Sequence, residues 1–358
     1  DFSIEGEREL KEYNINDNRR STENVVNFCN FLRQSDQHVV QVSKRTYDTE
    51  DAKEQSESKK IHFLIGTSDT IQSTIQDVLK NDGVVLTRTW AAAFDYVQDI
   101  DEAQAILLKN IYNSYYTSPI QIREEIVGHN NVTWVRSFRF ILGLWKSYFN
   151  GSFIDVIQSL KLYVDIDIHK LTPKILFQIK RLSENVFSNI DDHEKTCSVI
   201  ESFNAEIKKT DYIDFRQTIL GTDFEVPIFD ELDQERLVGS VNGLFWDTSY
   251  KLFEQVFSDN SRYMTVHQAK GLEWDKVVVS VMPNSRDKIE IASLYSSPCL
   301  TEETPADEFT RMYYVACSRA KEDLYIHIPS GCTKSEIESA IETFCKNSEQ
   351  SIAYEIIT

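Results

Sequence analysis

The sequence lacks the features of a membrane protein and of a metal-binding module. No apolar run approaches the roughly 20 residues that a membrane-spanning helix needs. Six cysteines are scattered with no C-x-x-C pair, which is typical of buried, reduced thiols in a cytosolic protein. The seven histidines form no ligand-spaced cluster, and Asp165-Ile-Asp-Ile-His169 is typical of a strand or a solvated loop. We therefore predict a cytoplasmic location, no membrane association and no metal site.

A phosphate-binding loop of the type G-x-x-x-x-G-K-[ST] is also missing, because the dipeptide Gly-Lys occurs nowhere in the chain. An acidic run of the type D-E-x-Q-D is absent as well. Any nucleotide site that uses this chain would therefore need these groups from another domain.

Positive charge is scarce. Lys and Arg total 38 against 57 for Asp and Glu, which gives a formal net charge of −19. Such a chain is repelled from nucleic acid at long range, so any contact with DNA has to come from a local track of donors. Single strands can be held by stacking, backbone amides and hydroxyls, so this charge argues against a broad basic patch only.

Three segments stand out in what is present. Thr265-Val-His-Gln-Ala-Lys-Gly-Leu-Glu-Trp-Asp275 is dense in groups that can contact phosphate or ribose, and the apolar strand-like run 277–282 follows it. The segment Glu308-Phe-Thr-Arg-Met-Tyr-Tyr-Val-Ala-Cys-Ser-Arg-Ala-Lys321 precedes a second apolar run at 324–328. Near the start, Tyr13-Asn-Ile-Asn-Asp-Asn-Arg-Arg-Ser-Thr22 leads into a helical pattern in which Ser21 is a suitable N-cap.

Together these segments closely resemble motifs V, VI and IV of the UvrD/Rep/PcrA family of superfamily 1 DNA helicases. The resemblance implies an α/β fold: a RecA-like parallel-sheet lobe, the second lobe of a P-loop NTPase, interrupted by a mostly helical inserted subdomain. Strand patterns at 61–65 and 84–88, with a helical pattern between them, agree with a parallel sheet. The resemblance also implies that the chain is the C-terminal part of a longer polypeptide, whose missing N-terminal lobe holds most of the ATP and Mg²⁺.

The resemblance assigns roles to individual residues. Arg319 corresponds to the arginine finger and Arg20 to a second cation on the γ-phosphate, as catalytic residues. The ATP-binding positions are Arg19 (where the family has an adenine-stacking tyrosine), Lys270, Gly271 and Glu273, the last accepting from a ribose hydroxyl. The positions expected to contact single-stranded DNA are Thr265, His267, Arg88 and Trp90.

Four regions are predicted along the chain. Residues 1–100 form the first part of the lobe, 101–261 the helical insert, 262–330 the second part of the lobe, and 331–358 a C-terminal tail with a helix at 335–346. Within the lobe, residues 36–58 are polar and predict an exposed loop. Helices are expected at 101–116, 134–149, 152–163, 173–190 and 196–209.

The helix expected at 134–149 leaves two interpretations open. It carries Trp134, Phe138, Ile141, Leu142, Trp145 and Phe149 on one face, with Arg136, Arg139 and Lys146 elsewhere. One interpretation is a core-packing amphipathic helix with solvated cations. The other is a surface that binds duplex DNA or a partner.

The function that the resemblance implies is ATP-dependent translocation on, or unwinding of, DNA, with single strands and duplex junctions as substrates. One alternative is a DNA-responsive ATPase subunit that regulates a partner nuclease in an antiphage defence system of the Gabija type. The acidic charge and the altered motif IV are compatible with it. A non-motor scaffold with a helicase fold is a third hypothesis, which the presence of both arginines disfavours.

Overall fold

The computed structural model describes residues 16–34, 40–108, 133–152, 154, 157, 168–191, 193–221, 243–257, 261–296 and 304–358. The chain divides into two compact units. Unit 1 comprises Asp1–Arg88 and Met264–Thr358, and unit 2 comprises Thr89–Tyr263. From the sequence, the helical insert is predicted to begin at residue 101 and the second part of the lobe at residue 262.

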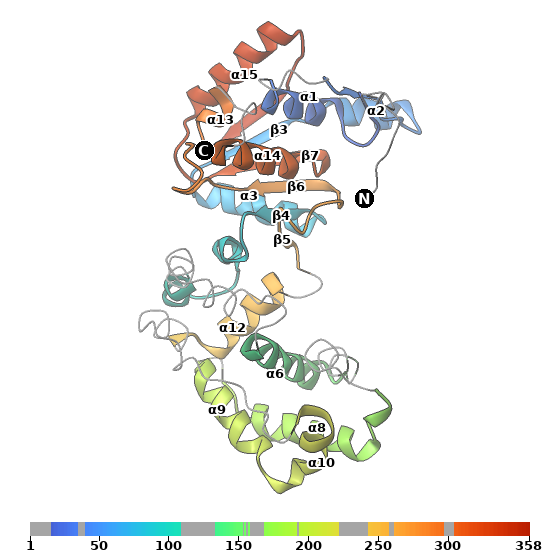
Figure 1. The fold of residues 1–358 in the computed structure, drawn as a ribbon, viewed down its shortest axis with the longest axis vertical. Coiled ribbons are helices and arrows are strands. Elements are labelled where there is room, and N and C mark those ends of the chain that lie inside the picture. The colour runs from blue at the N-terminus through green and yellow to red at the C-terminus, as the bar shows by residue number, and fades with distance from the viewer. Residues whose placement is uncertain are drawn as a thin grey trace, which may run out of the picture. The chain divides into compact units, whose positions relative to one another are not determined.

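Unit 1 is organised around a parallel sheet (Figure 1). Among the described residues the sheet has six strands in the order β5-β4-β6-β7-β3-β8. The pairs β4–β6, β6–β7, β7–β3 and β3–β8 are parallel. The α/β class with a parallel sheet is therefore confirmed. The strand bounds are β3 Ile61–Ile65, β4 Val84–Thr87, β5 Tyr263–Thr265, β6 Trp274–Ser280, β7 Ala320–Ile328 and β8 Tyr354–Ile357.

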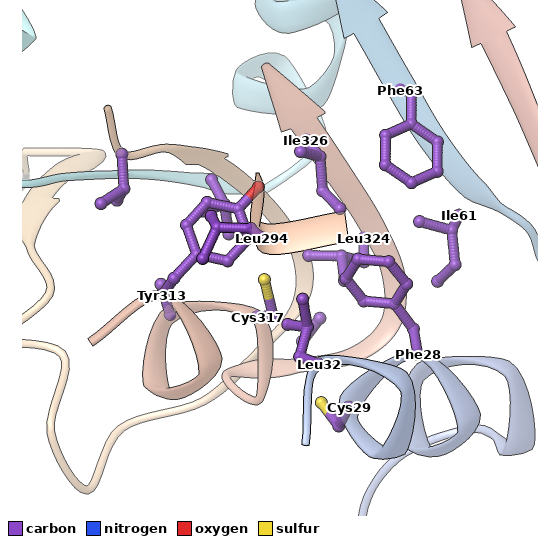
Figure 2. Close-up of a cluster of buried hydrophobic side chains, with 14 of the residues drawn as sticks. Phe28, Cys29, Leu32, Ile61, Phe63, Leu294, Tyr313, Cys317, Leu324 and Ile326 are labelled. Atoms are coloured by element: carbon purple, nitrogen blue, oxygen red, sulfur yellow. The ribbon is translucent and has the colours of Figure 1, made fainter. Parts of the chain in front are cut away.

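Helices cover both faces of this sheet. One face packs against α1 (Glu23–Leu32), α13 (Ser293–Ser296), α14 (Pro305–Cys317) and α15 (Lys334–Ser348), which share one buried cluster with the strands. Figure 2 shows part of this cluster, with Phe28 and Leu32 of α1 turned toward the strands and the ring of Phe28 near that of Phe63 of β3. Helix α3 (Asp69–Lys80) contacts β4 and β6 but contributes nothing to that cluster, so it covers the other face.

Two local patterns explain these elements. Strand β3 exposes almost none of Ile61, Phe63 and Leu64, as expected for a strand buried on both faces. In α3 the buried residues Ile71, Ile75 and Val78 recur at helical spacing, so one stripe faces the sheet. The strand predicted at 61–65 and the helix predicted after it are confirmed.

The prediction of a loop across 36–58 is wrong in part. Val42–Ser43 forms β2, which pairs in parallel with β1 (Asp17–Asn18), and Glu50–Glu57 forms the helix α2. The polar composition of α2 gave no apolar stripe from which to predict a helix. A two-residue strand is equally invisible to periodicity, because alternation needs at least four residues to register.

The C-terminal residues complete unit 1. Helix α15 confirms the helix predicted at 335–346, and it begins with a capping box between Thr333 and Glu336. The short apolar end of the chain forms β8, which adds to the sheet beside β3. The sequence did not predict this strand, whose register pairs Ile61 with Tyr354.

The described part of unit 2 is largely helical. The main helices are α6 (Thr133–Asn150), α8 (Pro173–Phe187), α9 (Thr196–Ile207) and α12 (Trp246–Leu252), and residues 102–108 form a further helical stretch. The shorter helical segments, of 3-10, α or π type, are η1 (Trp90–Tyr96), η2 (Ile168–Lys170), η3 (Thr210–Tyr212), α10 (Ile213–Phe215), η4 (Arg216–Leu220) and η6 (Phe253–Phe257). Most of the helix expected at 152–163, and the second half of the one expected at 101–116, lie outside the described residues.

Aromatic side chains form the core of unit 2. Trp145 of α6 lies edge-on to Phe187 of α8, with ring centroids 5.4 Å apart, and to Trp246 of α12 at 5.8 Å. Lys146 forms an ion pair with Glu254 at 2.7 Å. These contacts favour core packing for the second half of α6. The side chains of Arg136 and Arg139 lie outside the described residues.

None of the helices in the described ranges is both long and apolar enough to cross a membrane.

A buried histidine, His327, lies at the carboxyl end of β7. His327 is 5% exposed, and its Nε2 donates to the Gly66 carbonyl at 3.0 Å, so Nδ1 can accept from the Ser280 hydroxyl at 3.3 Å. Burial lowers the pKa of His327 because the charged ring is poorly solvated.

We predict that unit 1 loses stability as the pH falls below the ordinary histidine pKa of about 6.5. The unfolded chain then binds a proton that the folded chain resists, so protons favour unfolding until the lower folded pKa is passed. The measurement is the free energy of unfolding at pH 7.5 and 5.5 for the unaltered chain and for His327→Gln. The variant should show the smaller loss, because the other titrating groups are common to both. Equal losses would contradict the prediction.

Candidate functional site

Three charged residues from distant parts of the sequence meet at one edge of the sheet in unit 1. Arg20 precedes α1, Glu273 precedes β6, and Arg319 lies in the turn between α14 and β7. In the β6–β7 pairing Trp274 is opposite Ala320, and the Trp274 amide donates to the Arg319 carbonyl at 3.1 Å. Parallel pairing therefore brings Glu273 and Arg319, each one residue before a paired position, to the amino-terminal edge of the same two strands.

The turn that carries Arg20 is held by hydrogen bonds within the turn and by hydrogen bonds to β7. The Asn18 side-chain oxygen accepts from the amides of Arg20 at 3.0 Å and Ser21 at 3.1 Å. The Ser21 hydroxyl donates to the Ala320 carbonyl at 2.9 Å, and the Thr22 amide donates to the Lys321 carbonyl at 2.8 Å. The prediction that Ser21 caps α1 is therefore wrong: Thr22 occupies the N-cap position, and Ser21 fastens the turn to β7 instead.

Two of the three guanidinium nitrogens of Arg20 have partners, and the third has none among the described residues. Nη2 donates to the Ser318 carbonyl at 2.9 Å, and Nη1 lies 3.3 Å from Oε2 of Glu273. Its Nε is buried with no hydrogen-bond partner among the described residues. A buried donor left without an acceptor costs free energy.

Arg319 is held by a carbonyl of the preceding helix α14, a carbonyl of the neighbouring loop and the hydroxyl of Ser318. Nε donates to the Val315 carbonyl at 3.1 Å, Nη1 to the Leu272 carbonyl at 3.3 Å, and Nη2 to the Ser318 hydroxyl at 2.9 Å. Partial burial lowers the pKa of Arg319, and the nearby charge of Arg20 lowers it further. Two guanidinium groups so placed repel each other, and an anion between them would relieve the repulsion.

The remaining residues predicted to bind ATP line the exposed surface nearby. The Arg19 side chain is 80% exposed, and its Nη2 lies 3.9 Å from the carboxylate of Asp17. Lys270 and Gly271 are exposed in the turn before Glu273. Gly271 has φ of +89°, and a Cβ there would meet no atom within 4 Å, so glycine is favoured by backbone conformation and not by crowding.

The residues predicted to contact DNA are placed less uniformly. Thr265, the last residue of β5, is buried, and its hydroxyl donates to the Gln268 side chain at 3.3 Å, whereas His267 is exposed in the turn that follows. Arg88 makes a bidentate ion pair with Asp287, with Nη2 2.9 Å from Oδ1, and this arrangement favours a structural role. Trp90 begins η1, and its side chain lies outside the described residues.

Two residues beyond those predicted from the sequence contribute to the cluster. Ser318 supplies both a carbonyl to Arg20 and a hydroxyl to Arg319. Arg45, from the stretch predicted as a loop, donates to the Lys321 carbonyl at 3.1 Å and pairs with Glu322 at 2.6 Å, next to the β7 residues that hold the Arg20 turn. Ser318 lies beside a predicted residue and could have been suspected, whereas nothing in the sequence distinguishes Arg45 from other surface cations.

Comparison with known proteins identifies this part of the chain. Residues 248–330 match the family model of the UvrD-like helicase C-terminal domain. The matched range includes Glu273 and Arg319 and the segments compared above with motifs V and VI, and Arg20 lies outside it. No curated protein gives a significant match to the chain. Residues 248–330 therefore form a region of the UvrD-like helicase C-terminal type.

Proposed function

We propose that this chain is the C-terminal part of an ATP-dependent DNA helicase or translocase, and that it supplies one wall of an ATP site. The observation that carries the proposal is the convergence of Arg20 and Arg319 at one sheet edge, with the Arg20 Nε buried and unpartnered among the described residues. Guanidinium groups bind phosphate oxygens in a bidentate way and stay charged at neutral pH. This donor set fits a polyphosphate.

Each residue has a distinct task in this proposal. Arg319 is the arginine finger, which stabilises the negative charge that develops on the transferred phosphoryl group. Arg20 binds the same phosphate from the α1 side, and Glu273 accepts a hydrogen bond from the ribose. Lys270, Gly271 and Arg19 line the exposed approach to these groups.

The phosphate-cradling loop and the residues that hold Mg²⁺ belong, in this proposal, to a second RecA-like lobe. The chain contains no Gly-Lys dipeptide with which to build that loop itself. ATP supplies the free energy that closes the two lobes on each other, and the arginines complete their contacts only in the closed state. Alternate closing and opening would move the chain along a single DNA strand held by backbone and hydroxyl donors around Thr265 and His267.

ATP hydrolysis in the presence and absence of single-stranded DNA tests this function. The 358-residue chain alone should show no magnesium-dependent turnover. The chain together with a RecA-like lobe that carries the Walker motifs, on the same polypeptide or as a subunit, should hydrolyse ATP faster when oligodeoxythymidine is added. Appreciable turnover by the chain alone would contradict the proposal. Turnover that required a nuclease partner would instead favour the regulatory ATPase.

A further inference from the structure

The carboxylate of Glu273 lies where an anionic ligand of Arg20 would lie. It is 3.3 Å from the Arg20 Nη1, and the neighbouring Nη2 is already committed to the Ser318 carbonyl. The Arg20 Nε is buried and has no partner among the described residues, so Nη1 is the nitrogen that contacts the carboxylate. The two side chains are 35% and 41% exposed, so solvent and solutes can reach the pair.

The same carboxylate also acts on Arg319. The charge of Arg20 lowers the pKa of Arg319, and the charge of Glu273 opposes that effect. Glu273 therefore offsets part of the repulsion between two cations that main-chain carbonyls hold in fixed positions. A triphosphate would bring its own negative charges to the same two cations, and it would meet the carboxylate there.

We propose that Glu273 is an internal counter-ion of this site, and that a polyphosphate must displace its carboxylate from Arg20 before it can bind both arginines. This inference rests on the proposed function and adds to it a competition that sets the affinity for phosphate. After displacement the carboxylate is free to turn toward a ribose hydroxyl, so the two tasks of Glu273 belong to successive states. Binding of the phosphates and release of Glu273 are then one event.

The size of the effect follows from ordinary electrostatics. Breaking a partly exposed ion pair changes an equilibrium constant by up to about fivefold. Removing a negative charge a few ångströms from a multivalent anion adds a second factor, which salt screens. We expect Glu273→Gln to bind inorganic tripolyphosphate about three- to tenfold more tightly than the unaltered chain at low ionic strength, with a smaller difference in high salt.

The experiment is a titration of the 358-residue chain with tripolyphosphate. Calorimetry and the NMR signals of the arginine Nε–H groups monitor the binding. Arg20→Lys and Arg319→Lys assign those signals. The matched control is Asp275→Asn, which makes the same charge change two residues away, at a carboxylate that pairs with Lys321 at 2.8 Å. Asp275→Asn should stay within about twofold of the unaltered chain, because its carboxylate does not contact Arg20. Arg20→Ala and Arg319→Ala should both weaken binding.

The outcomes separate this inference from the proposed function. If both arginine variants weaken binding and Glu273→Gln leaves it unchanged, the counter-ion is overturned and the phosphate site stands. If Glu273 contacted only the ribose, Glu273→Gln should leave the binding of tripolyphosphate unchanged and weaken the binding of ATP. If Asp275→Asn tightens binding as much as Glu273→Gln, general charge explains the effect and the counter-ion is again overturned. Binding that ignores both arginines, or no binding by any variant, would remove the phosphate site and the inference with it.

Discussion

Replacing Arg319 by alanine should remove at least about 3 kcal/mol of transition-state stabilisation, which is a loss of more than about 100-fold in the rate of ATP hydrolysis. The reason is that a fixed cation stabilises the phosphoryl charge only if it is in place before the reaction. Three hydrogen bonds to Val315, Leu272 and Ser318 already place this guanidinium. The measurement is single-turnover hydrolysis by the chain together with a RecA-like lobe that carries the Walker motifs, with ATP binding determined separately.

Two further variants make this result specific. Arg319→Lys keeps the charge but loses the planar fork, so it should recover only a small part of the rate. Arg286→Ala removes an exposed arginine elsewhere in unit 1 and should change the rate by less than about twofold. If Arg319→Ala turns over as fast as the unaltered protein, Arg319 is not a finger. If the unaltered protein is itself inert with single-stranded DNA present, the scaffold hypothesis takes precedence.

The sequence predicted those parts of the fold that local pattern determines. Strand β3, helix α3 and helix α15 all have apolar residues at a spacing that indicates their type and their buried face. Elements fixed by distant partners were missed. Strand β8 is four residues long and exists as a strand because β3 pairs with it, and β2 exists because β1 lies beside it. Neither fact is contained in the local sequence.

The candidate site likewise combines residues that the sequence predicted with contacts that it could not predict. The resemblance to helicase motifs selected Arg20, Glu273 and Arg319. The fold places Glu273 3.3 Å from Arg20, and Ser318 accepts a hydrogen bond from each of the two arginines. The resemblance could not predict which atoms accept hydrogen bonds from the two arginines, because backbone carbonyls carry no sequence signature. Arg88 shows the same limit. The resemblance placed it among the residues expected to contact DNA, and it could not predict that Asp287, 199 residues away, engages its guanidinium.

Phe28→Ala should lower the free energy of unfolding of unit 1 by about 3–5 kcal/mol, since large-to-small changes in a packed core lose both transfer free energy and cavity contacts. Phe28 is fully buried on α1, with its ring centroid 5.7 Å from that of Phe31 and 5.9 Å from that of Phe63, which it meets edge-on (Figure 2). Trp274 is the sole tryptophan of unit 1, so fluorine NMR of the fluorotryptophan-labelled chain can follow this unit in urea.

Phe149→Ala is the matched control, because this phenylalanine is 64% exposed and belongs to unit 2. It should change the stability of unit 1 by less than about 0.5 kcal/mol. A loss below about 1 kcal/mol for Phe28→Ala would contradict the packing described for α1. The expected loss also bears on the site, because Arg20 sits in the turn that leads into α1. A helix that packs less firmly on β3 holds that turn less firmly against β7, so Phe28→Ala should weaken tripolyphosphate binding even in conditions where the chain stays folded. Core packing and phosphate affinity are then coupled through a single helix.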